Sequence, residues 1–173
     1  YLDTQTNCDI IDINMGCPVP KIVKGSGGAS LMKDPDKAVA IVESIVKHVK
    51  KPVTVKTRLG WDSKSLNIVE FAKRLEKAGA SAIAIHGRTR VQMYEGNADY
   101  ELIKQVKEAL SIPVIVNGDI TTTQKAEEVL AYTKADALMI GRGVLGRPWF
   151  VKEVVEALDG KKIEEISFEE RFE

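Results

Sequence analysis

The sequence contains little cysteine, few aromatic residues and no excess of charge of either sign. Only Cys8 and Cys17 occur among 173 residues, and their spacing fits no metal site, so we expect no metal. Nothing suggests a disulfide framework, which favours a reducing, cytoplasmic setting. The 25 basic and 25 acidic residues cancel, so no overall field attracts nucleic acid, and any such contact needs a local basic patch. Apolar runs are too short to span a bilayer, so we expect no membrane partner.

What the sequence does contain is regular alternation. Short β-branched runs alternate with amphipathic segments of helical period, a pattern typical of a parallel α/β sheet. The predicted strands are nearly all apolar, as strands covered on both faces are. They span 9–14, 53–57, 82–86, 114–117 and 137–140.

Helices are predicted after these strands. The first begins at Asp34, an N-cap residue followed by Pro35. A later one opens with the capping-box pattern Thr121-x-x-Gln124, and the last begins at Pro148. The intervening glycine-rich run, 25–30, matches no Walker or dinucleotide spacing. We interpret it as a flexible loop able to close over a ligand, or as a plain connector.

Polar or glycine residues follow every predicted strand. A doubly wound sheet gathers its site at one switch point, whereas a barrel brings all the strand ends together. We therefore predict an α/β fold, a (β/α)8 TIM barrel. A full barrel needs about 250 residues, so we expect about five C-terminal β/α units in 1–160 and the start of a truncated segment in 161–173. The strand-end residues are Asn14, Cys17, Lys56, Arg58, His86, Arg88, Asn117–Asp119 and Gly141–Gly143.

Cys17 is the candidate acid or nucleophile. It lies in the run Asp12-Ile13-Asn14-Met15-Gly16-Cys17-Pro18, just past the end of the first strand. In a barrel, this end of the strands forms the active site. A buried cysteine that fills a small gap remains the alternative.

Cations and glycines at the other strand ends indicate an anionic ligand. Lys56 lies within a buried strand, where an unpaired charge is costly, so an anionic ring or phosphate explains its position. His86 ends the next strand and is a candidate ligand-binding residue. Two glycine-containing loops, 117–119 and 141–143, follow the last two strands, where barrels commonly bind phosphate. Arg142 adds a forked cation. Tight turns that simply require glycine remain the alternative.

Taken together, these motifs resemble the tRNA-dihydrouridine synthases of the bacterial type. The matching runs cover almost the whole chain in the family's order. The resemblance implies an FMN-binding barrel that reduces a uracil of tRNA to 5,6-dihydrouracil, with NADPH as external reductant. The runs are 12–18, Val55-Lys56-Thr57-Arg58-Leu59-Gly60-Trp61, His86-Gly87-Arg88-Thr89-Arg90, Asn117-Gly118-Asp119-Ile120, Ile140-Gly141-Arg142-Gly143 and Gly146-Arg147-Pro148-Trp149.

The resemblance also implies roles for single residues. Cys17 takes the position of the proton donor to uracil C5, since thiols are mostly protonated at neutral pH. Asn14 matches an asparagine beside the flavin and the uracil. Arg88, Arg90 and Arg147 are expected to contact tRNA phosphates at the barrel mouth. The expected FMN-binding residues are Lys56, His86, Asn117, Gly118, Asp119, Gly141 and Arg142. By the same resemblance, we expect the family's first three strands and its C-terminal helical domain to lie outside the given sequence.

Two other functions remain open. An FMN-dependent dehydrogenase of a free pyrimidine, of the dihydroorotate or dihydropyrimidine type, would also place a residue like Cys17 after such a run. The run 86–90 and a basic mouth argue against it, because a free base does not need them. The other possibility is a non-catalytic, phosphate-binding half barrel.

Five strands would leave two open sheet edges, so we also expect self-association.

Overall fold

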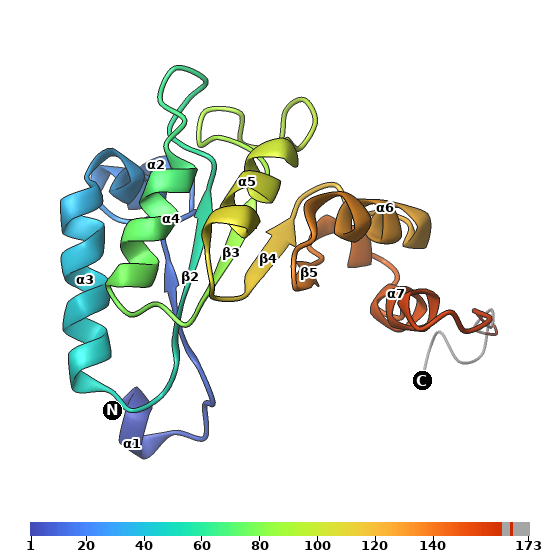
Figure 1. The fold of residues 1–173 in the computed structure, drawn as a ribbon, viewed down its shortest axis with the longest axis horizontal. Coiled ribbons are helices and arrows are strands. Elements are labelled where there is room, and N and C mark those ends of the chain that lie inside the picture. Colours follow the sequence, from blue (N-terminus) through green and yellow to red (C-terminus); the bar gives the residue numbers. More distant parts are fainter. Residues whose placement is uncertain (164–166, 168–173) are drawn as a thin grey trace.

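The computed structural model describes residues 1–163 and 167, and its centre is one parallel sheet (Figure 1). The strands are paired in chain order, which is the order found around a barrel. This confirms the predicted fold class, with five β/α units present. The strands are β1 (Ile11–Asn14), β2 (Val53–Arg58), β3 (Ala82–His86), β4 (Val114–Asn117) and β5 (Ala137–Met139).

The longer helices between successive strands lie on one side of the sheet, as right-handed crossovers between neighbouring strands require (Figure 1). None of the described helices is long and apolar enough to cross a membrane. They are α1 (Leu2–Gln5), α2 (Pro20–Lys24), α3 (Pro35–His48), α4 (Ile68–Lys77), α5 (Glu101–Ala109), α6 (Thr123–Thr133) and α7 (Phe150–Leu158), with short 3-10 helices η1 (Gly28–Lys33) and η2 (Arg142–Val144).

The two faces of the sheet differ in composition because side chains alternate along each strand. One face carries a row of paired apolar residues, Ile13, Val55, Ile83 and Val114, which pack in the main core with residues of α3, α4 and α5. The opposite face carries two other rows. These are Asn14, Lys56, Ala84 and Ile115, and then Arg58, His86 and Asn117. On this second face Ala84, Arg58 and His86 are buried, whereas Asn14 is exposed, so the described residues cover it only in part.

The strand bounds follow the predictions closely, with one informative difference. β1 begins at Ile11 rather than Asp9, and the Ile11 N–H donates to the Pro52 carbonyl at 3.0 Å. Pro52 has no N–H to donate, so the ladder cannot continue toward the N-terminus. β5 ends at Met139, one residue earlier than predicted.

Two predicted helix starts are wrong by one or two residues. Thr122, not Thr121, caps α6, and its hydroxyl accepts from the Lys125 N–H at 3.0 Å. Helix α7 begins at Phe150 rather than Pro148, because the Phe150 N–H still closes a turn onto the Arg147 carbonyl at 3.0 Å. The start of α3 after Asp34 is confirmed. Of the tail 161–173, positions 164–166 and 168–173 lie outside the described residues, so the segment expected there stays a prediction.

Candidate active site

A cleft of about 630 Å³ lies where the strands end. It collects every residue predicted to donate a proton or to bind a cofactor, together with Asn14. Arg88, Arg90 and Arg147 do not line it. Its lining residues are Asn14, Gly16, Cys17, Pro18, Lys56, Arg58, His86, Tyr94, Asn117, Gly118, Asp119, Ile120, Thr121, Met139, Ile140, Gly141, Arg142 and Gly143.

Hydrogen bonds to its backbone hold Cys17 in place. The Asn14 side-chain oxygen accepts from the N–H groups of Gly16 and Cys17, both at 3.0 Å, and the Ala29 N–H donates to the Cys17 carbonyl at 3.0 Å. Gly28 has φ +56°, and a Cβ there would lie 2.7 Å from the Cys17 oxygen. The glycine-rich run thus enters η1, which packs directly against the cysteine.

Lys56 is a half-buried cation whose described partners include no carboxylate. Among residues 1–163 and 167, its Nζ has one polar contact, with the Asn117 side-chain oxygen at 3.4 Å. Asn117 is oriented by donating its Nδ2 hydrogen to the Met139 carbonyl at 2.7 Å. Burial, then the charge of Arg58, lowers the pKa of Lys56 from 10.5. An anionic ligand in the cleft would relieve both effects.

Arg58 is missing from the predicted site residues, although it follows Lys56 by two positions and so shares its face of β2. Its Nε donates to the Gly16 carbonyl, and its Nη1 donates to the carbonyls of Thr89 and Met93, all at 2.9 Å. The side chain thus joins the cysteine loop to the loop after β3. Alternation along the strand was the signal that could have identified it.

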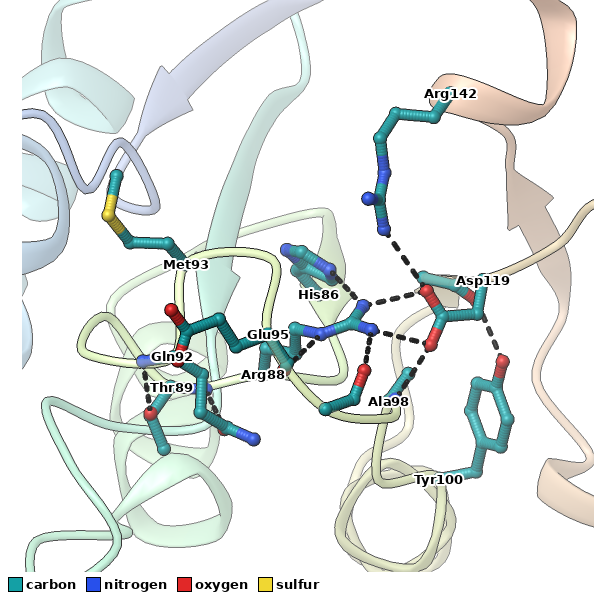
Figure 2. Close-up of polar contacts among 12 residues, drawn as sticks. His86, Arg88, Thr89, Gln92, Met93, Glu95, Ala98, Tyr100, Asp119 and Arg142 are labelled. Carbon is teal, nitrogen blue, oxygen red and sulfur yellow. Dashed lines mark hydrogen bonds and ion pairs between the residues drawn. The ribbon is translucent and has the colours of Figure 1, made fainter.

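Asp119 lies at the centre of an ion-pair network (Figure 2). Arg88 donates to both carboxylate oxygens, at 2.8 and 2.7 Å, and Arg142 donates to Oδ1 at 3.2 Å. The Ala98 N–H donates to Oδ2 at 2.8 Å. Partial burial alone would raise the pKa of Asp119, but the bonds from Arg88 and Ala98 outweigh it and lower the pKa. Asp119 thus remains charged and fixes the orientation of Arg142, which also stacks over Tyr94, 4.6 Å from the ring centroid.

His86 ends β3 with 6% of its surface exposed, and it lines the cleft. Burial, then the charges of Arg58 and Lys56, lowers its pKa to about 3, so the imidazole is neutral at neutral pH. Its ring lies 6.3 Å from that of Tyr94, centroid to centroid. Tyr94 is a lining residue that sequence reasoning missed, because nothing in its local sequence signals that the loop after β3 folds back over the cleft.

The three arginines predicted to contact tRNA occupy different environments. Arg88 is 2% exposed and bonded to Asp119, so its position does not fit a phosphate contact at the surface. Arg90 stacks on Trp61, with its Cζ 4.8 Å from the ring centroid. Arg147 donates from Nε to the Gly143 carbonyl at 3.1 Å, which ties together the turn that precedes α7.

The charges of the cleft fit an anionic, phosphate-bearing group. Its lining contains the cations Lys56, Arg58 and Arg142 but one carboxylate, Asp119, which Arg88 already holds. Backbone at Gly118, where φ is +126°, turns the loop after β4 beside these cations. This donor set suits FMN, the cofactor that the sequence resemblance implies.

The order of the strands and the shared cleft at their ends define part of a β/α barrel. Solved structures agree on the fold. A 2,3-dimethylmalate lyase matches with TM-score 0.60 and 18% identity over 95% of this chain and 63% of that chain. The N-acetylmannosamine-6-phosphate 2-epimerase from Clostridium perfringens matches with TM-score 0.51 and 16% identity over 90% of this chain and 57% of its own.

Sequence comparison identifies the family. The sequence model of Dihydrouridine synthase (Dus) matches residues 2–172, so the chain belongs to this family, as its motifs predict. It is 49% identical over 167 residues to tRNA-dihydrouridine synthase B of Vibrio vulnificus, covering 96% of this chain and 52% of that protein. It is 52% identical over 153 residues to a probable tRNA-dihydrouridine synthase of Rickettsia bellii, covering 88% and 47%. The chain thus spans about half the length of the curated relatives it matches.

Proposed function

We propose that the protein carrying this chain reduces a uracil of tRNA to 5,6-dihydrouracil in the cytoplasm, with FMN as bound cofactor and NADPH as external reductant. One observation carries the proposal: a single cleft holds the Cys17 loop and the cations Lys56 and Arg142. Membership of the dihydrouridine synthase family supplies the class of substrate.

FMN would be held by the residues that carry the unbalanced positive charge. Lys56 would contact an anionic part of the flavin, because no carboxylate among the described residues forms an ion pair with it. Arg142, already oriented by Asp119 and Tyr94, and the backbone of the loops after β4 and β5 would bind the phosphate. When bound and reduced, FMN supplies the hydride that C6 of the uracil accepts.

Cys17 supplies the other hydrogen. Addition of hydride at C6 leaves an electron pair at C5, and the Cys17 thiol gives its proton to that carbon. The thiolate then regains a proton from solvent. The bonds from Asn14 and Ala29 fix the backbone that carries the thiol. A uracil stacked within tRNA cannot enter the cleft, so the base must be flipped out of its stack.

The test is Cys17→Ala in the full-length protein. Loss of a general acid should slow dihydrouridine formation in tRNA about 10²–10⁴-fold, while flavin absorbance and NADPH oxidation remain. Cys8→Ala is the matched control, because Cys8 lies outside the cleft. Normal dihydrouridine formation by Cys17→Ala would refute the role of the thiol. Turnover of free uracil or dihydroorotate without activity on tRNA would refute the substrate class.

A further inference from the structure

The Arg88 guanidinium uses all five of its N–H groups (Figure 2). Its Nε donates to the Glu95 carbonyl at 3.0 Å, and its Nη2 donates to the Gly96 carbonyl at 2.5 Å and to Asp119 at 2.7 Å. One hydrogen of Nη1 goes to Asp119 at 2.8 Å, and the other is directed at Nε2 of His86, 3.4 Å away. The side chain is 2% exposed, so water does not compete for these donors.

This contact decides which nitrogen of His86 carries the proton. A guanidinium in a protein is always protonated and offers only donors. Nε2 must therefore present its lone pair to Arg88, which leaves the hydrogen on Nδ1. A proton on Nε2, in the other tautomer or in the imidazolium, would set one N–H against another at a buried position. The nearby charges of Lys56 and Arg58 also oppose the imidazolium.

The remaining nitrogen of His86 is available to a ligand. His86 lines the cleft, and no described residue bonds to Nδ1. In Figure 2 the second ring nitrogen points away from Arg88. The imidazole is also confined on its Nε2 side, since a Cβ on Gly118 would lie 3.1 Å from the ring carbon Cδ2.

We propose that Arg88 is a positioning residue that fixes His86 as the neutral Nδ1–H tautomer, so that the ring donates a hydrogen bond to an acceptor atom of FMN. The choice of ligand rests on the proposed function. Arg88 itself does not touch the ligand: it acts through His86, and at its other end it holds the carboxylate that orients Arg142.

The tautomer can be measured directly by long-range ¹H–¹⁵N spectra of the flavin-free protein labelled with ¹⁵N-histidine. The variant His86→Asn identifies the signals of His86. At pH 7 we expect a protonated Nδ1 and an unprotonated Nε2, with the Nε2 resonance shifted from that of a free imidazole by the Arg88 hydrogen bond. Detection of Nε2–H or of the imidazolium would overturn the proposal, and so would an unshifted Nε2 resonance. None of these results requires a substituted Arg88 to fold.

The role of Arg88 is then tested by Arg88→Lys. Lysine keeps the positive charge but cannot donate to both Asp119 oxygens and to His86 in the same fork, so we expect the Nε2–H form of His86 to become populated by tens of per cent. Signals of the exposed His48, whose Nδ1 lies 2.6 Å from the Ser44 carbonyl, should stay unchanged and report an intact fold. An unaltered His86 tautomer in a folded Arg88→Lys protein would overturn the role of Arg88.

Addition of FMN separates this inference from the proposed function. We expect FMN to slow the solvent exchange of the Nδ1 proton, which becomes hydrogen-bonded. If FMN binds and both His86 nitrogen signals and the exchange rate stay unchanged, the donor role is wrong while the cofactor assignment stands. If FMN does not bind at all, the proposed function fails, and the tautomer is still judged by the spectra of the flavin-free protein.

Discussion

One face of the sheet buries Val55, Ile83 and Val114 beneath helices, whereas the other directs Lys56, Arg58 and His86 toward the cleft. The two sets alternate along the same strands, so residues with opposite roles are covalent neighbours. The apolar side chains stabilise the fold by leaving water, while the polar ones keep charge at a partly buried position at a cost in stability. Substitutions on the two faces should therefore have separable effects.

The largest expected effect concerns the two open edges of the sheet, at β1 and β5. Prepared alone, the 173-residue chain should not behave as a 19.0 kDa monomer, because β1 and β5 each have one strand neighbour among the described residues. Size-exclusion chromatography with light scattering measures this. Ile10→Lys, at an exposed residue before β1, should reduce association, and Val155→Lys, on the exposed side of α7, should not. A cooperatively folded, FMN-loaded monomer would contradict the prediction.

Next in size is a change on the covered face. Ile83 is fully buried between the sheet and the helices, so Ile83→Ala should lower the free energy of unfolding by about 2–5 kcal/mol. Flavin affinity at a temperature where the variant is folded should remain close to that of the parent. Urea unfolding followed by circular dichroism measures the first quantity. Ile10→Ala, at a residue that is 53% exposed, is the control and should cost little.

A change on the face that lines the cleft should have the opposite pattern: weaker flavin binding with little loss of stability. Lys56→Met should weaken FMN binding about 10- to 100-fold, since a charge-assisted contact contributes roughly 1.5–3 kcal/mol. Stability of the flavin-free protein should stay the same or rise, because a half-buried cation without a carboxylate partner is removed. Fluorescence titration and urea unfolding give the two values. Lys77→Met, on the exposed end of α4, is the matched control, and equal FMN affinity in both variants would remove Lys56 from the site.

The effect that is smallest near neutral pH is a pH dependence of stability. Burial and neighbouring cations lower the pKa of His86 to about 3, whereas a histidine in an unfolded chain titrates near about 6.5. As the pH falls through this window, the unfolded chain binds the proton first, so stability is complete above about 6.5 and is lost toward 3. The variant His86→Asn lacks this term and should lose stability less steeply. Unfolding curves measured from pH 7 to pH 4 would reveal it, and identical slopes for the two proteins would argue against a depressed His86 pKa.

Much of the sheet could be predicted because its signals are local. Apolar runs between turn residues locate strands, and consecutive β/α units with polar strand ends indicate a barrel. The predicted cleft residues also meet, because the carboxyl ends of parallel strands share one edge. The segment 20–33 could not be predicted in this way: its two short helices depend on the close contact of Gly28 with Cys17, which joins residues that are not neighbours in a helix or a strand.

Charge was the least predictable property of the site. The sequence shows where arginines occur but not which carboxylate each arginine pairs with. From the motif 86–90, Arg88 is predicted to contact a phosphate at the surface. The structure instead buries it against Asp119, 31 positions further along the chain. The same limit explains why Tyr94 was missed, since its role depends on how the loop after β3 returns over the strand ends.

The three acceptors that hold Arg58 are all main-chain carbonyls, from Gly16, Thr89 and Met93. Every amino acid supplies such a carbonyl, so the link between the cysteine loop and the loop after β3 places no demand on the side chains at positions 89 and 93. Position 89 is constrained for another reason, because the Thr89 side chain is 3% exposed and its hydroxyl accepts from the Gln92 N–H at 3.3 Å. The spacing between the Cys17 loop and the loop after β3 therefore depends on the side chain at 58 and on main-chain atoms at its three partners.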